Sequence, residues 1–203
     1  MFSISFHEFC HGLAAYRLGD NTAKRMGRLT MNPLANLDIT GLIMLVLFHF
    51  GWAKPVPVNM NNFKNPRKGM AITAAAGPIS NLLLAVVFMF IYGLLYIPSG
   101  RNDIVEYIGE MFVVGCYMNI GLAVLNIIPV PPLDGSKVLF AFMSDEAYYK
   151  LMKYERYGMI IMVILVATGI LGTPLSKLSS AIFSALLPVA QTGSNITYYL
   201  FYR

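Results

Sequence analysis

The sequence predicts an all-α polytopic membrane protein, a bundle of transmembrane helices with a small membrane-associated β element. Two observations support this prediction. Of the 203 residues, 57% are apolar and only 12% are charged, which is about half the charged share of a soluble domain. The charges are also clustered, because five stretches contain no Asp, Glu, Lys or Arg: 39–53, 69–100, 111–133, 157–176 and 178–202.

Four of these stretches are long enough to cross a bilayer as a helix, which takes about 20 apolar residues. The stretch at 39–53 is shorter and is better interpreted as a re-entrant or interfacial segment. The alternative is a soluble protein with four buried core helices, but the chain is too short to bury that many. We therefore expect a multi-pass integral membrane protein whose helices contact the lipid bilayer.

The expected helices follow the apolar stretches and their breaks. They cover 1–17, 70–97, 111–128, 157–173 and 178–201, with a short apolar segment reaching Met143 and with Pro188 and Gly193 interrupting the last helix. Between them, the segment 24–32 could form a strand. The segment 54–63 alternates apolar with polar or proline positions, as an edge strand does.

Basic residues flank the apolar stretches. The net charge of +5 could indicate a nucleic-acid partner, but the placement of the charges follows the positive-inside rule better, so no nucleic acid is expected. The rule places the loops at 17–36, 53–68 and 144–156 in the cytoplasm. The loop at 98–110 is mainly acidic and is expected on the outside.

Residues 7–11 read HEFCH, a match to the HExxH pattern. On a helix, His7 and His11 share a face and lie about 6 Å apart along the axis. Two imidazoles placed in this way can bind one zinc ion, and Glu8 between them can act as the general base. Ionisable groups beside a membrane span are costly and usually functional. The alternative is a helix end whose polar residues lie near the lipid headgroups.

A catalytic zinc site uses three protein ligands and one open position. Asp134 is the best third ligand, because it follows an uncharged stretch broken by prolines. Irregular backbone at membrane depth must line a cavity or be buried in protein. Asp134 could instead cap a helix that starts near Ser136. His49 is a rival ligand, although its position beside Trp52 is more typical of an interfacial aromatic.

Three motifs occur in order along the chain: HEFCHG at 7–12, GPISN at 77–81 and NIIPVPPLDG at 126–135. In these motifs the chain resembles the site-2 protease family of intramembrane zinc metalloproteases. The resemblance covers about two-thirds of the chain. The stretch from Asn32 to Pro57 resembles the short bacterial members of this family, which lack attached PDZ and CBS domains.

The resemblance implies a role for each motif residue. It implies zinc bound by His7, His11 and Asp134, with Glu8 as the base. It also implies that Asn81 helps to hold the substrate carbonyl or oxyanion, whereas an isolated Asn in a membrane helix commonly makes an interhelical hydrogen bond.

The implied activity is hydrolysis of peptide bonds in or near transmembrane segments of membrane protein substrates, in a bacterial cell membrane. Residues 1–203 would form a single membrane-embedded metalloprotease domain, with C-terminal transmembrane helices at 157–201. A substrate helix would have to unwind, and an edge strand at 54–63 could receive it by strand addition. One alternative is a zinc or proton transporter that uses the same His and Asp residues. Glu8 discriminates between the two functions, because a transporter does not need a general base and a protease does. The other alternative is a non-catalytic binding homologue, against which the intact set of His7, His11 and Asp134 with Glu8 argues.

Three features depart from the family pattern. Cys10 stands where the family usually has Gly, and a thiol three residues from His7 could compete for the metal or become oxidised. Both Cys10 and Cys116 are expected to be buried free thiols. Asn36 replaces a His that is common in such members. The sequence begins six residues before His7, so we expect it to lack the first half of its catalytic helix.

Overall fold

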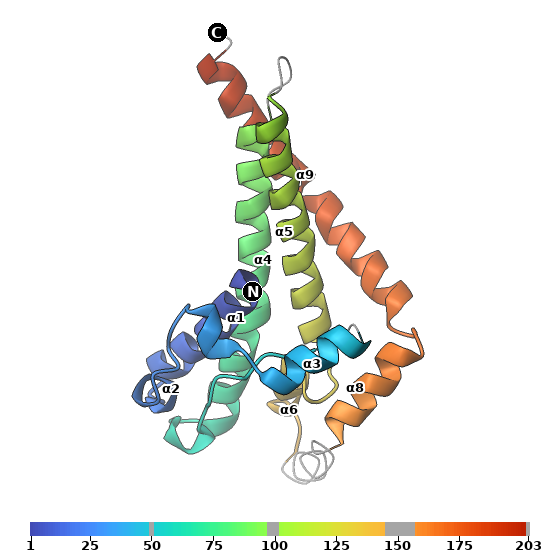
Figure 1. Cartoon of the computed structure of the whole chain (residues 1–203). Helices are drawn as coiled ribbons and strands as arrows, with labels where there is room; N and C mark the ends of the chain where they lie inside the picture. The colour runs from blue at the N-terminus through green and yellow to red at the C-terminus, as the bar shows by residue number, and fades with distance from the viewer. Residues whose placement is uncertain (49–50, 97–101, 145–156, 202–203) are drawn as a thin grey trace. The chain divides into compact units, whose positions relative to one another are not determined.

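The computed structural model describes residues 1–48, 51–96, 102–144 and 157–201 (Figure 1). Its helices in chain order are α1 (Phe2–Arg17), α2 (Thr22–Arg25), the 3-10 helix η1 (Pro33–Asn36), α3 (Ile39–Phe48), the 3-10 helix η2 (Met60–Asn62), α4 (Pro66–Leu95), α5 (Asp103–Ile127), α6 (Asp134–Phe140), α8 (Gly158–Ala167) and α9 (Gly172–Phe201). The chain forms two compact units, Met1–Ser80 with Asn126–Met162 and Asn81–Leu125 with Val163–Arg203.

The first unit contains α1, the polar connections that follow it and the beginning of α4. Helix α1 ends where predicted, since Gly19 adopts a φ of +107°, in a region that favours glycine. The chain then turns back, and the amide of Asp20 donates to the carbonyl of Ala15 at 2.9 Å. This turn directs the residues after α1 back along the helix.

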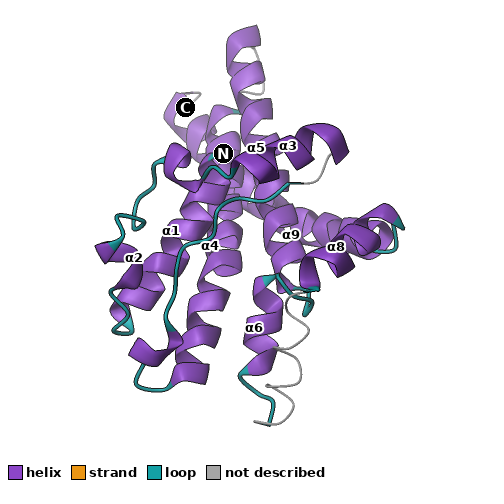
Figure 2. Cartoon of the chain, turned by 60° about the horizontal axis from the view of Figure 1, so that its bottom comes forward, coloured by secondary structure: helices purple, strands orange, loops and turns teal. Residues whose placement is uncertain are grey.

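The part of the chain that the structure describes contains no strand, so the predicted β element is wrong (Figure 2). In the segment 24–32, α2 continues to Arg25 and Gly27 then makes a turn with a φ of +66°. The segment 54–63 has no neighbouring strand among the residues that the structure describes, and its backbone amides at Lys54, Val56 and Asn59 donate elsewhere. Lys54 donates to the carbonyl of Asn36, and Val56 and Asn59 donate to carboxylates on other segments. Two prolines remove further donors.

The second unit is built on the C-terminal half of α4, on α5 and on α9. Its core consists of Ala85, Met89, Cys116, Ile120, Val124 and Ala190. Helices α4 and α9 approach closely, because a Cβ atom at Gly93 would lie 2.1 Å from the carbonyl oxygen of Ala190. Small residues permit such approaches in membrane proteins. The hydroxyl of Thr197 also donates to the carbonyl of Leu94 at 2.7 Å.

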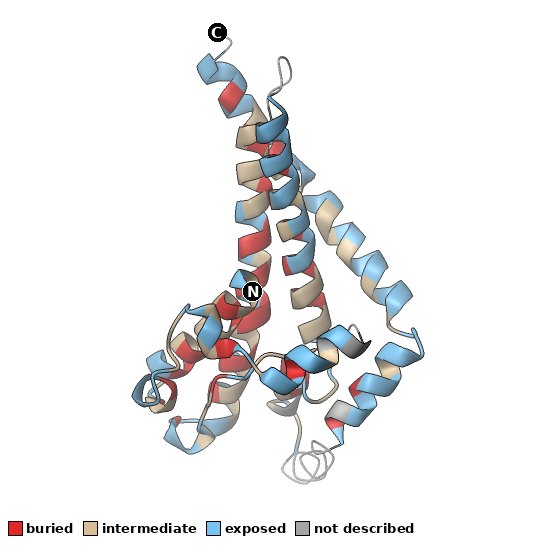
Figure 3. Ribbon diagram, in the orientation of Figure 1, coloured by how far each residue is buried: buried red, intermediate tan, exposed pale blue. Residues whose placement is uncertain are grey.

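Helices α4 and α5 are each long and apolar enough to cross a membrane, with mean hydropathies of 2.1 and 1.7. Their large apolar side chains are often exposed, as at Leu83 and Val114, which suits contact with lipid (Figure 3). Helix α5 begins at Asp103, eight residues before the predicted start. Acidic residues in this first turn favour the helix N-terminus. The chain is an integral membrane protein.

The predicted pair of C-terminal spans is corrected by the structure. Helix α8 ends at Ala167 and is too short to cross a bilayer. Helix α9 begins at Gly172 and continues through Lys177 and Pro188, two positions at which the sequence suggested a break. Helices α8 and α9 qualify as a span only together, with a bend of 83° between them. The described residues therefore contain two candidate spans, or three if the bent pair counts as one.

Candidate metal centre and catalytic site

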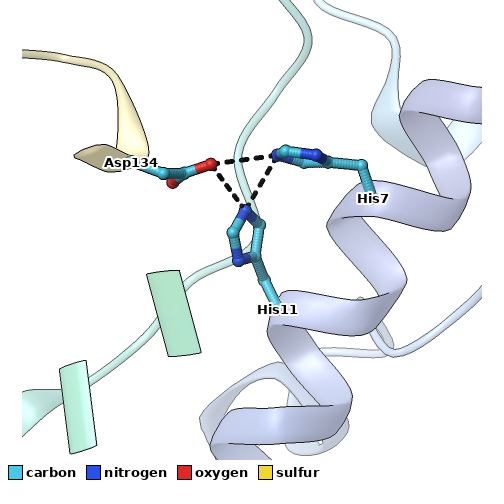
Figure 4. Close-up of side chains that lie close together, drawn as sticks. All are labelled: His7, His11 and Asp134. Atoms are coloured by element: carbon cyan, nitrogen blue, oxygen red, sulfur yellow. Dashed lines mark hydrogen bonds and ion pairs between the residues drawn. The ribbon is translucent and has the colours of Figure 1, made fainter. Parts of the chain in front are cut away.

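Three side chains of the first unit converge on one point (Figure 4). His7 and His11 project from one face of α1, and Asp134 is the first residue of α6. The two Nε2 atoms lie 2.9 Å apart, and each lies 3.1 Å from Oδ2 of Asp134. The exposed fractions of the three residues are 6%, 8% and 7%. The sequence prediction that these three residues meet agrees with this geometry.

The donor set fits zinc. Two imidazole nitrogens and a carboxylate oxygen around a tetrahedral zinc ion would lie about 3.3 Å apart, given bonds of about 2.0–2.2 Å. Nδ1 of His11 donates to the carbonyl of Thr73 at 2.7 Å, so that a neutral ring presents its Nε2 lone pair to Asp134. This bond is the outer-shell contact that usually orients a metal-binding histidine. Facing lone pairs repel each other, and a cation between them converts that repulsion into coordination.

The turn before α6 places Asp134. Leu133 occupies the N-cap position and the cap has no side-chain hydrogen bond, so Asp134 is not the helix cap considered from the sequence. Gly135 is closely packed, because a Cβ atom there would lie 2.1 Å from the carbonyl oxygen of Ile127. The hydroxyl of Ser136 donates to the carbonyl of Leu133 at 2.7 Å. The carboxylate is therefore free to point towards the histidines.

Helix α4 packs against the two histidines. A Cβ atom at Gly77 would lie 2.5 Å from Nε2 of His11 and 2.5 Å from Cε1 of His7. Thr73, whose carbonyl accepts the hydrogen bond from Nδ1 of His11, lies one turn earlier on the same helix face. The small-residue run before Pro78 predicted close packing in general. Nothing in the sequence singled out the Thr73 carbonyl, because every residue carries one.

We predict that Gly77→Ala lowers zinc binding and proteolysis together. The added methyl group would overlap both imidazoles, and one histidine must leave the geometry that brings the donor atoms together. The reduction in zinc affinity should exceed about tenfold, the lower limit for losses that only misorient a ligand. Metal analysis after dialysis against a graded chelator measures it. Gly121→Ala is the matched control, since a Cβ atom there meets nothing within 4 Å, and equal losses in both variants would contradict the packing argument.

Glu8 is partly exposed, and its Oε2 accepts a hydrogen bond from the backbone amide of Val56 at 2.9 Å. A carboxylate has two oxygens, and this bond occupies only one of them. The Val56 amide was missed in the sequence. The sequence does contain a signal for this contact. Pro55 and Pro57 have no backbone N–H, so Val56 carries the single amide donor among these three residues.

The remaining predicted residues are distributed as follows. Asn81 belongs to the second unit and is fully buried, and neither atom of its amide has a hydrogen-bond partner among the described residues. The interhelical hydrogen bond considered for it is therefore not made within that part of the chain. His49 lies outside the described residues. Cys10 and Cys116 are free thiols, partly exposed and buried respectively, and Cys10 is not in the cluster of His7, His11 and Asp134.

Comparison with known proteins places the chain in a family. The model of Peptidase family M50 matches residues 92–171, which contain Asp134. The Bacillus subtilis protein named "Putative zinc metalloprotease YwhC" is 36% identical over 200 residues, which cover 91% of this chain and 90% of the relative. The chain belongs to the site-2 protease family. It is accordingly a zinc metalloprotease.

Two further relatives of this chain carry similar names. "Putative zinc metalloprotease Rip2" of Mycolicibacterium smegmatis is 29% identical over 172 residues, covering 83% of this chain and 64% of the relative. "Putative zinc metalloprotease MJ0611" of Methanocaldococcus jannaschii is 33% identical over 135 residues, covering 66% of this chain and 63% of the relative. No solved structure gives a significant match to the chain.

Proposed function

We propose that this zinc metalloprotease is an intramembrane endopeptidase that hydrolyses peptide bonds in or near transmembrane segments of membrane proteins. One observation carries the proposal. His7 and His11 of α1 lie against Thr73 and Gly77 and meet Asp134 of α6 at their Nε2 atoms. Thr73 and Gly77 belong to α4, a helix able to cross a membrane. A metal site built against a spanning helix is suited to peptide bonds at membrane depth.

In this proposal His7, His11 and Asp134 hold the zinc ion. When bound, zinc activates water and polarises the scissile carbonyl. Glu8 accepts the proton of the attacking water and delivers it to the leaving amine. Asn81 is proposed to donate to the substrate carbonyl oxygen, which develops negative charge. Its place in the GPISN motif supports that role, as does its buried side-chain amide, which has no hydrogen-bond partner among the described residues.

We further propose that residues 1–203 act as one membrane-embedded protease domain in a bacterial cell membrane, with the chain crossing the bilayer several times. The relatives from Bacillus and mycobacteria support the bacterial setting. The candidate spans support the membrane setting. The substrates are then proteins anchored in the same bilayer.

A cleavage assay in lipid vesicles tests this function. The full chain is reconstituted with a library of doubly tagged transmembrane substrates, and mass spectrometry maps each cut. Cuts in or next to the spans support the proposal. Cuts confined to soluble domains would refute the intramembrane specificity. Zinc or proton transport without any cleavage would favour the transporter.

Labelling of single cysteines tests the membrane topology. We expect Asp103→Cys to react with an impermeant maleimide only from outside the cell and Lys64→Cys only from the cytoplasm, because the basic clusters flank α4 at its N-terminal end. The matched background replaces Cys10 and Cys116 by Ala. Both labelled positions are exposed in the structure. Labelling of residue 103 from the cytoplasm alone would reverse the proposed orientation.

A further inference from the structure

Segment 54–62, an irregular stretch that ends in the 3-10 helix η2, reaches the face of α1 that carries Glu8. The Val56 amide donates to Glu8 Oε2 at 2.9 Å, and the Val56 side chain is 8% exposed. Gly12 is four residues after Glu8, on the same helix face. A Cβ atom at Gly12 would lie 3.3 Å from Cγ1 of Val56. The segment therefore packs against α1 beside the proposed base.

Arg28 holds the segment just before Val56. Its Nη2 donates to the carbonyl of Lys54 at 2.7 Å and to that of Pro55 at 3.4 Å. Its Nη1 donates to the carbonyl of Ala35. One guanidinium thus joins the segment to the chain around η1. A lysine offers a single nitrogen in place of this planar fork.

Asp20 holds the segment just after Val56. Its side chain is fully buried, with Oδ2 accepting from the amide of Asn59 at 2.7 Å and Oδ1 accepting from Nδ2 of Asn62 at 2.7 Å. The amide and hydroxyl of Thr22 also donate to Oδ1. Burial opposes ionisation of the Asp20 carboxyl, but these hydrogen bonds outweigh it and lower the pKa below its ordinary value. Asp20 is therefore a carboxylate that accepts hydrogen bonds from the segment.

We propose that Arg28 and Asp20 are positioning residues for the general base. They hold segment 54–62 on both sides of Val56, so that the Val56 amide fixes one oxygen of Glu8 and leaves the other available for the water proton. The proposal rests on the proposed role of Glu8. Its physical basis is that a general base must stay within hydrogen-bond reach of its proton, and that small displacements of catalytic groups are costly.

Removal of the Val56 amide proton tests the central contact. Val56→Pro eliminates the donor while keeping a compact apolar side chain between two prolines. Val56→Ala keeps the donor and removes side-chain packing. In lipid vesicles, we expect Val56→Pro to lower kcat about 10- to 100-fold with KM changed less than about threefold, since the base is displaced while substrate binding is not. Val56→Ala should lower kcat much less, and an equal or larger loss in Val56→Ala would overturn the role of the amide.

Arg28→Lys and Asp20→Asn test the two holding residues. Lysine replaces the two donor nitrogens of the planar guanidinium with a single nitrogen. The side-chain amide introduced by Asp20→Asn replaces one carboxylate acceptor with an N–H donor. Each change should lower kcat about tenfold with KM and bound zinc unchanged. Arg25→Lys and Asp38→Asn are the matched controls, because Arg25 is exposed and Asp38 keeps its helix-capping Oδ1 as Asn. Unchanged kcat in Arg28→Lys and Asp20→Asn would overturn the proposal.

A double-mutant cycle separates positioning from general structural support. Glu8→Asp keeps a carboxylate but shortens it by one methylene, so that the Val56 amide is out of reach. In this background we expect Arg28→Lys and Asp20→Asn to reduce the remaining activity less than about twofold, because they act through a contact already lost. The same tenfold loss in both backgrounds would overturn the proposal. Undiminished cleavage by Glu8→Gln would instead contradict the proposed function itself.

Discussion

Glu8→Gln is expected to lower kcat/KM for a transmembrane substrate by about 10²- to 10⁴-fold, the usual contribution of a general base, while zinc stays bound. Glutamine has the size of glutamate and can still accept from the Val56 amide through its oxygen, so the local structure is kept. It cannot accept the water proton. Cleavage assays measure the activity, and metal analysis of the same sample should give about one zinc per chain.

Glu110→Gln is the matched control, since this exposed glutamate lies on α5, outside the metal cluster. Full cleavage by Glu8→Gln would exclude Glu8 as the base. A transporter using the same histidines would keep metal transport in this variant, because transport does not require the base. The Glu8→Gln variant therefore distinguishes a protease from a metal transporter by the activity that is lost, because both would still bind the metal.

Two of the three residues of the proposed metal site follow from the sequence, because they are close together along the chain. The four-residue spacing of His7 and His11 fixes a shared helix face once α1 forms. Asp134 is 123 residues from His11, and no periodicity connects them. The chemical need for a third zinc ligand and the motif resemblance selected it. The structure adds what those arguments cannot supply, which is the common point at which the three donor atoms meet.

The error in the segment 54–63 has a clear cause. Alternating apolar and polar residues indicate that every second side chain points towards the protein interior. A strand gives this pattern, but so does a non-helical chain that packs on a helix. A strand also needs a partner for its amides. Here Val56 and Asn59 donate to the carboxylates of Glu8 and Asp20, and the alternation of the segment does not identify those acceptors.

The bounds of the C-terminal helices were mispredicted for a different reason. Charge-free stretches locate apolar chain, but they do not locate turns within it. The turn at Gly169, with a φ of +67°, lies inside an apolar stretch and ends α8 early. Lys177 lies inside α9 and does not break it. Neighbouring helices, side chains and small backbone adjustments satisfy the groups that a proline frees in membrane helices, which is consistent with α9 passing through Pro188.

Asp134→Ala is expected to lower zinc affinity more than about 100-fold, beyond the 10–100-fold range typical of losing an outer-shell partner, and to abolish proteolysis. The change removes the one carboxylate in the cluster and leaves two neutral imidazoles, which hold a divalent cation without charge compensation. Competition with a chelator of known affinity measures the effect. Asp134→Asn is the companion variant, since it keeps the side-chain shape and one oxygen and should retain more zinc than Asp134→Ala.

The controls decide whether the loss is specific to this carboxylate. Asp103→Ala removes an exposed carboxylate at the start of α5 and should leave zinc affinity unchanged. His49→Ala should also leave it unchanged, because the cluster of His7, His11 and Asp134 could by itself provide the three protein ligands that a catalytic zinc site uses. If His49→Ala released the metal and Asp134→Ala kept it, the third ligand would be His49. The contact of 3.1 Å between Asp134 and each histidine would then be an ion pair beside the metal site.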